Sequence, residues 1–131
     1  MAAKAQLQEK LQKAVENYNI SQNELTKCVE NLQKLDAQLN ENNLVEQELK
    51  LLTSSDNVYK LIGPVLVKQD LEESKANVSK RIEYISGELK RFDARMKDLK
   101  QKQADASKEL NTAQTEFQAK FGGKAPIAVS Q

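Results

Sequence analysis

Few side chains in this sequence could carry covalent or metal chemistry. Its 131 residues contain no His and a single Cys, Cys28. The adjacent carboxylates of Glu72 and Glu73 are common at a helix start. The sequence has no Gly-rich phosphate loop and no nucleophile motif. We therefore expect a protein that is not an enzyme, binds no metal and needs no cofactor, with Cys28 in a structural role.

The chemistry that the sequence does offer is apolar association, concentrated in "NVYKLIGPVLVKQD" at 57–70. The flanking sequence is polar and rich in helix formers, whereas this stretch is β-branched and apolar. Residues 58–62 and 65–69 predict two strands of a hairpin over 57–69, with Gly63 and Pro64 at the turn. An isolated two-stranded hairpin is marginal in water, and this one is apolar on both faces. Its unpaired edges would also accept further strands. We therefore predict that it assembles with other chains through Val58, Tyr59, Leu61, Ile62, Gly63, Pro64, Val65, Leu66 and Val67.

Apolar residues separated alternately by four and three positions run along both sides of the hairpin. This heptad spacing predicts two long helices, over 4–52 and 70–121, with a flexible tail at 122–131. The a positions of the first helix are Leu11, Tyr18, Leu25, Leu32 and Leu39, and those of the second include Ile82, Leu89, Met96, Leu110 and Phe117. Asp70 and Glu73 form a helix start signal.

Two arms of similar length around a reversal predict an antiparallel coiled coil. If facing positions sum to 124, Leu11 faces Ala113, Ala14 faces Leu110 and the polar Ser21 faces Gln103. Glu46 falls awkwardly on the seam, and we expect it to reach Lys75 or Arg81. The fold class is therefore mainly α: a single domain over 1–131, with a long two-helix coiled coil joined by one β-hairpin that joins hairpins of other chains in a sheet or an intersubunit β-barrel.

Charge and hydropathy narrow the class of protein further. The 20 basic and 19 acidic residues are interspersed, which argues against nucleic acid and against a polybasic membrane anchor. The longest apolar stretch, "LIGPVLV", is too short to span a bilayer, and the N-terminus lacks a signal-peptide core. We expect a soluble, cytoplasmic protein. A structural coiled-coil adaptor forming an extended dimer is the alternative, although an adaptor gains nothing from an apolar strand pair.

The chain resembles the prefoldin family in three stretches. These are "LNENNLVEQELKLL" at 39–52, "VYKLIGPVLVKQ" at 58–69 and "KRIEYISGELKR" at 80–91. A single hairpin is typical of the beta-type subunits. The resemblance implies a hetero-hexamer of alpha-type and beta-type subunits, held together by a hairpin barrel. It also implies that the coil tips capture non-native proteins such as nascent actin and tubulin, and pass them to the cytosolic chaperonin without ATP.

The family likeness places client binding at the free ends of the two helices. The residues predicted there are Leu7, Leu11, Ala14, Leu110, Ala113, Phe117 and Phe121. Coil ends fray, and we expect Ala layers to pack loosely, so that the seam opens and presents apolar side chains. The alternative is that these are ordinary seam residues. Phe121 is the better candidate, because it lies just off the seam.

Overall fold

The computed structural model describes residues 2–121, and it is mainly α as predicted. Helix α1 (Ala2–Lys50) is followed by strands β1 (Val58–Ile62) and β2 (Val65–Gln69) and by helix α2 (Leu71–Phe121). The tail predicted at 122–131 lies outside the described residues. The chain divides into two compact units. Within the described residues we call 2–30 with 93–121 the terminal unit and 31–92 the hairpin unit, and treat each by itself.

The first helix begins and ends two residues earlier than predicted. Ala2 and Ala3 are strong helix formers, which explains the earlier start. At the other end Leu51 N donates to Glu48 O and Leu52 N to Leu49 O, both at 3.2 Å. Bonds to the third preceding residue mark a tightened turn, so the α-helix stops at Lys50.

A short polar turn follows α1. The carboxylate of Asp56 accepts a hydrogen bond from Thr53 N at 2.7 Å, while Asp56 N donates to Thr53 O at 2.9 Å. Backbone and side chain together therefore close the turn. Thr53 and Asp56 thus use their backbone and side-chain groups in the connection between α1 and β1 and not in the helix.

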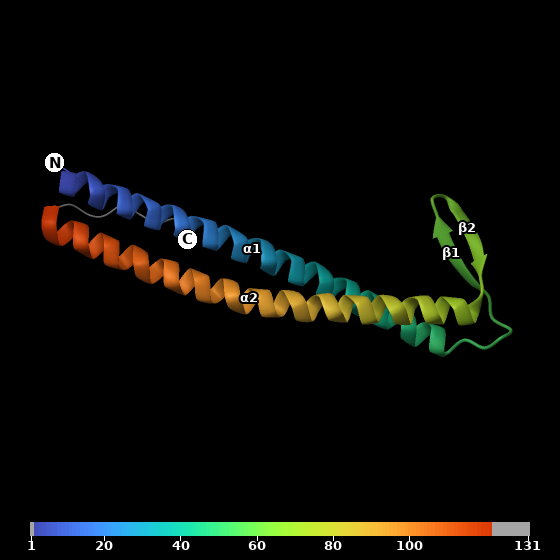
Figure 1. Cartoon of the computed structure of the whole chain (residues 1–131). Coiled ribbons are helices and arrows are strands. Elements are labelled where there is room, and N and C mark those ends of the chain that lie inside the picture. Colours follow the sequence, from blue (N-terminus) through green and yellow to red (C-terminus); the bar gives the residue numbers. More distant parts are fainter. Residues whose placement is uncertain (1, 122–131) are drawn as a thin grey trace. The chain divides into compact units, whose positions relative to one another are not determined.

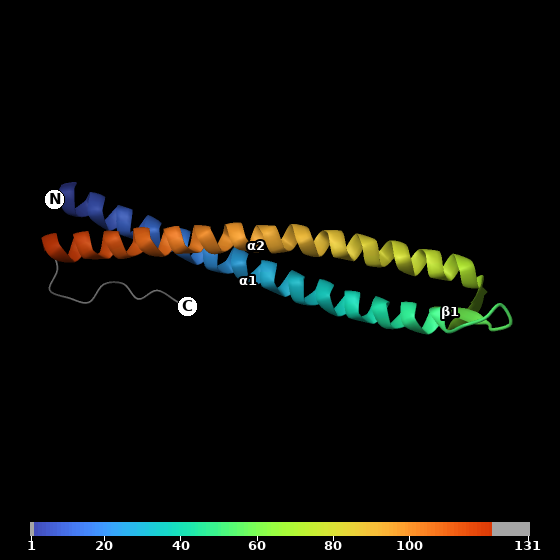
Figure 2. The same ribbon diagram turned by 90° about the horizontal axis from the view of Figure 1, so that it is seen from below.

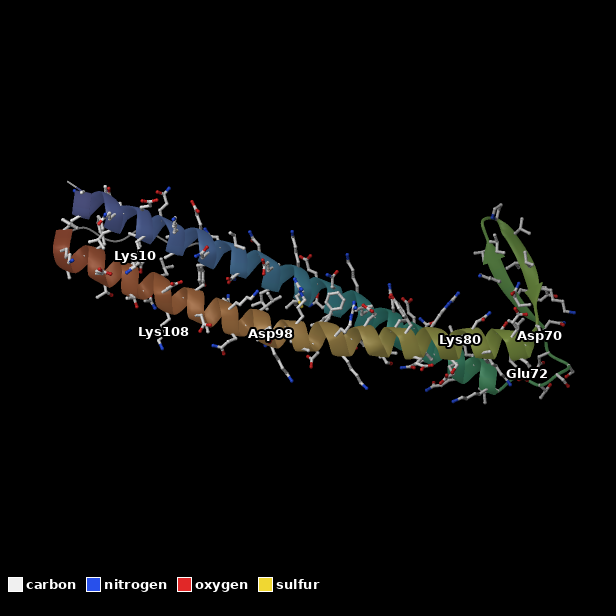
Figure 3. All side chains as sticks on the ribbon, viewed as in Figure 1. Lys10, Asp70, Glu72, Lys80, Asp98 and Lys108 are labelled. Carbon is white, nitrogen blue, oxygen red and sulfur yellow. The ribbon has the colours of Figure 1, made fainter. Side chains whose placement is uncertain are left out.

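Asp70 caps the start of α2, as predicted. Its Oδ2 accepts a hydrogen bond from Glu73 N at 3.0 Å, which satisfies one of the free N–H groups of the first turn. Figure 3 shows Asp70 where β2 passes into α2, with Glu72 beside it. The helix therefore begins at Leu71, one residue later than the predicted range, because Asp70 is the cap and not a helical residue.

In the terminal unit, α1 and α2 pack along the predicted seam. Leu11, Ala14, Leu110 and Ala113 form a buried cluster, with Val15, Tyr18 and Phe117 packed against it. Figures 1 and 2 both show the first part of α1, in blue, beside the last part of α2, in orange and red. Burial of these positions confirms the heptad phase in this unit.

Polar contacts in the terminal unit confirm the predicted register. Lys10 Nζ lies 3.0 Å from Glu116 Oε2, and the side-chain amide of Gln103 donates to that of Gln22. The residue numbers of these two pairs sum to 126 and 125, close to the predicted sum of 124. Gln22 thus takes the partner role that the sequence had suggested for its neighbour Ser21. A slip of one heptad would separate both pairs.

In the hairpin unit, the seam positions Leu49, Val78 and Ile85 are buried. The prediction that Glu46 reaches Lys75 or Arg81 is wrong. Glu46 Oε1 lies 3.4 Å from Lys50 Nζ on its own helix, and Lys75 Nζ lies 3.7 Å from Glu72 Oε1. Partners three or four residues away on the same helix are simply nearer than those on the other arm.

The two strands pair antiparallel, from Val58 with Gln69 to Ile62 with Val65. The two-residue loop between them is Gly63-Pro64, and Gly63 has a φ of 59°. Since Pro64 is restricted to negative φ, the loop has the signs of a type II′ turn, which matches the twist of the flanking strands. Gly63 is required at its position, because other residues rarely adopt a positive φ.

Candidate functional site

The hairpin is the largest group of exposed apolar side chains in the hairpin unit. Figure 1 shows β1 and β2 standing away from α2 as a separate ribbon. Leu61 and Leu66 are 67% and 65% exposed. We call the exposed residues Tyr59, Leu61, Ile62, Val65, Leu66 and Val67 the hairpin surface. Of the other predicted assembly residues, Val58 is half-buried and Gly63 and Pro64 are exposed at the turn.

The register assigns the hairpin surface to two faces. Directly paired residues project to the same side of a sheet, and successive residues alternate. One face therefore carries the pairs Tyr59–Lys68 and Leu61–Leu66. The opposite face carries Val58–Gln69, Lys60–Val67 and Ile62–Val65. Each face thus has an exposed apolar pair next to the turn and one lysine further along.

The backbone edges of the hairpin are also defined. In an antiparallel pair, residues that exchange two hydrogen bonds alternate with residues that exchange none. The pair Ile62–Val65 closes the two-residue loop and exchanges both bonds. The pairs Leu61–Leu66 and Tyr59–Lys68 therefore direct their N–H and C=O groups outward, where another strand would bind.

Of the seven predicted tip residues, four lie in the closed seam. Leu11, Ala14, Leu110 and Ala113 are buried together, and Ala113 is the most buried of all the core residues. Each Ala shares its layer with a Leu, and all four side chains are buried. Opening of these layers to a client stays a prediction.

The remaining three tip residues leave apolar surface accessible. The rings of Phe117 and Phe121 lie one helical turn apart, with centroids separated by 5.7 Å and planes inclined at 50°. Phe121 is 39% exposed, while Phe117 and Leu7 are half-buried. This tilted arrangement is a favourable aromatic contact. Phe121 is therefore the exposed side chain of the tip, and Phe117 and Leu7 add part of their apolar surface.

Sequence reasoning missed a third exposed apolar group, at the end of α1. Leu44, Val45 and Leu51 are exposed within the hairpin unit. The signal was present, because Leu44 and Leu51 lie seven residues apart at f positions, opposite the seam. An analysis limited to the a and d positions misses exposed leucines at f positions.

Residues 2–121 contain neither a membrane-spanning helix nor a cluster of potential metal ligands. No helix within residues 2–121 is long and apolar enough to cross a membrane. Nor do these residues contain a group of three acidic or Cys side chains placed to hold a metal ion. The described residues present apolar surfaces on a helical scaffold, and such surfaces suit binding and assembly.

These features define a class of protein: a chain of two long helices joined by a β-hairpin whose apolar side chains are exposed. The prefoldin subunit family matches residues 12–123. The chain is 47% identical to prefoldin subunit 6 of Mus musculus over 120 residues, covering 92% of this chain and 94% of that one. It is 55% identical to prefoldin subunit 6 of Arabidopsis thaliana over 92 residues, or 70% and 71% of the two chains.

A solved structure shows the same fold. The prefoldin beta subunit from Thermococcus strain KS-1 superposes with a TM-score of 0.52 at 21% identity, over 88% of this chain and 94% of that one. The chain belongs to the prefoldin family. It is thus a chaperone subunit with coiled-coil helices, and the resemblance found in the sequence is confirmed.

Proposed function

We propose that this chain is one beta-type subunit of a hetero-hexameric prefoldin that captures non-native proteins and delivers them to the cytosolic chaperonin. Nascent actin and tubulin are the proposed clients, and the cytoplasm is the proposed site of action. The observation that carries the proposal is an apolar hairpin exposed on both faces, in a chain that aligns almost end to end with subunit 6 relatives.

Assembly would follow from the hairpin surface. Burying one large apolar side chain stabilises an interface by about 1.5–3 kcal/mol, and the hairpin surface offers six such residues. The outward N–H and C=O groups of Leu61 and Leu66 supply the hydrogen bonds that add a strand to each edge. Hairpins from several subunits joined in this way would close into a β-barrel, which removes the free edges.

Client capture would begin at the Phe117–Phe121 pair. Its rings are the accessible apolar surface of the tip, while Leu11 and Leu110 are closed off by the Ala layers. A partly exposed ring binds a client weakly. Several tips acting together hold it by avidity, and weak separate contacts allow release. Neither capture nor release of a client in this way needs a nucleotide or catalysis.

Native mass spectrometry of the complex purified from its own cells tests the assembly. The expected species contains six prefoldin subunits, and the same sample suppresses aggregation of denatured actin without ATP. A homodimer of this chain alone, with no other prefoldin subunit, would instead support the extended adaptor. A hexamer that has no effect on client aggregation would contradict the proposed activity.

A further inference from the structure

Strand β2 has an edge that another strand can join. Because Ile62 and Val65 exchange both bonds next to the turn, Leu66 and Lys68 direct their N–H and C=O groups away from β1. In the described part of the chain, the one hydrogen bond to these four groups is a 3.3 Å contact from the adjacent Gln69 Nε2 to Lys68 O. The register from Val65 to Gln69 contains no bulge and no Pro, so the strand itself does not block a partner.

This edge is complementary to itself. When two copies of β2 lie antiparallel about a two-fold axis at Val67, Leu66 of each copy faces Lys68 of the other. Both residues direct their backbone groups outward, so each facing pair exchanges two hydrogen bonds. The axis brings the two Val67 residues together, and the ends pair Val65 with Gln69. This register therefore satisfies the outward groups of both strands without any change in the hairpin.

The neighbouring registers of the same edge are less favourable. An axis at Leu66 would set Lys68 opposite Pro64, which has no N–H to donate. An axis at Lys68 would set two lysines directly opposite each other, and like charges in that position destabilise a sheet. The register centred on Val67 combines four backbone hydrogen bonds with no facing charges.

The β1 edge is less suited to pairing with itself. Its outward residues are Tyr59 and Leu61, so the corresponding two-fold axis passes through Lys60. The two Lys60 residues would face each other at a Cα separation of about 4.5 Å, and their charges would repel. Val67 is the direct partner of Lys60 within the hairpin. The two edges therefore differ chiefly in the residue that lies on the axis.

We infer that β2 pairs with β2 of a second copy of this chain, in a four-stranded antiparallel sheet with Val67 on the two-fold axis. Facing residues project to the same side of a sheet. The exposed Leu61 and Leu66 of one copy would therefore share a row with Lys68 and Tyr59 of the other. The alkyl stem of Lys68 would cover Leu66 while its ammonium group stays in water. The inference concerns the chain on its own and does not rest on the proposed function.

Disulfide trapping in the purified full-length chain tests the register. Val67→Cys places two thiols on the axis, with Cα atoms about 4.5 Å apart, which a disulfide can bridge. Lys60→Cys is the matched control, because three strand spacings, roughly 14 Å, would separate position 60 in the two copies. Cys28 is buried and stays in both variants.

Mild oxidation should link position 67 of one chain to position 67 of another, as identified by peptide mass spectrometry. The yield should exceed that of the control by about tenfold, since only the first pair of thiols lies within bonding distance. A control that links position 60 in equal or greater yield would overturn the inference, as would the absence of a link at position 67.

A charge at the axis provides the second arm. Val67→Lys sets two ammonium groups opposite each other, whereas Ile62→Lys places the same charge on the outer strand. Both residues are exposed, so both variants should keep the helical circular dichroism signal. Sedimentation of the unmodified chain should show a monomer–dimer equilibrium. Val67→Lys should raise its Kd by about tenfold and Ile62→Lys much less.

Two sedimentation results would contradict the pairing. One is an unmodified chain that stays monomeric at every concentration, as expected if another part of the chain covers the edge. The other is an equal change of Kd in the two lysine variants.

A homotypic pair would compete for the β2 edge with the hetero-assembly proposed above. The dimer locked by the disulfide at position 67 should therefore form no hexamer with other prefoldin subunits until a reductant is added. A locked dimer that enters the hexamer would overturn the claim that both assemblies use this edge. If the reduced chain dimerises but enters no complex with other subunits, the proposed function fails and the homotypic pair is unaffected.

Discussion

Leu61 lies directly opposite Leu66 across the hairpin, and both side chains are exposed. Close cross-strand packing of two leucines normally accompanies burial against a core. Here the pair covers only itself. An exposed leucine pair of this kind supports the proposal that the hairpin joins other subunits.

Replacing this pair should abolish assembly without unfolding the helices. In the double variant Leu61→Gln and Leu66→Gln, the interface would lose about 3–6 kcal/mol of apolar burial. Native mass spectrometry should show the loss of the hexamer, while circular dichroism of the isolated chain keeps its helical signal. Ile20→Gln, which also removes an exposed apolar residue, is the control. A double variant that assembles like this control would remove the hairpin surface from the interface.

The two described glycines should respond in opposite directions to Ala. Gly63 has a positive φ, so Gly63→Ala strains the turn by about 1–2 kcal/mol. Gly87 lies within α2, with open space where a Cβ would stand. Gly87→Ala should therefore stabilise the helix by roughly 0.5–1 kcal/mol. Thermal unfolding of the assembled protein should show a lower Tm for the first variant and a higher one for the second. Shifts in the same direction would contradict the assigned backbone roles.

Loss of the cap at Asp70 should weaken the junction between β2 and α2. Asp70→Ala removes the acceptor for Glu73 N and should cost about 1 kcal/mol. Asp70→Asn keeps an acceptor oxygen and is the matched control. Hydrogen exchange of the first turn of α2 is the measurement, because it reports local opening. Faster exchange in the Ala variant alone is the expected result, and equal exchange in both variants would show that the cap is dispensable.

Client binding should depend on the exposed ring of the tip more than on the buried seam. Phe121→Ala removes accessible apolar surface, and a loss of about 1 kcal/mol would weaken one arm roughly fivefold. The unfolding temperature should hardly change. The measurement is suppression of client aggregation as a function of complex concentration. Undiminished suppression would show that client contact lies elsewhere.

The buried seam of the tip offers a contrasting variant. Leu110→Ala opens a cavity in the cluster of the terminal unit and should destabilise the chain by about 2–5 kcal/mol. If clients bind through an opened seam, this variant should increase its client affinity. If the seam has only a packing role, the chain loses stability and gains no affinity. Unfolding and client-binding measurements on the same sample distinguish these results.

Much of the local structure could be read from residue order. The heptad phase predicted the buried cluster around Leu110, and the cap at Asp70 and the loop at Gly63 followed from local chemistry. The partner of Glu46 could not be predicted in this way. The sequence allows Lys50, Lys75 or Arg81 as the partner of Glu46, and only the side-chain distances show that it is Lys50.

The sequence by itself determined the two helices and the strands between them, because spacing along a chain sets which residues share a helical face. Heptad spacing alone permits registers that differ by seven residues, and the contacts Lys10–Glu116 and Gln22–Gln103 selected the predicted one. Only the tertiary structure decided which apolar side chains stay in solvent. The Ala and Leu side chains of the tip seam are buried, while Phe121, Leu44, Leu51 and the hairpin surface remain exposed. Exposure depends on what the opposing surface fills, and that is a property of packing in three dimensions.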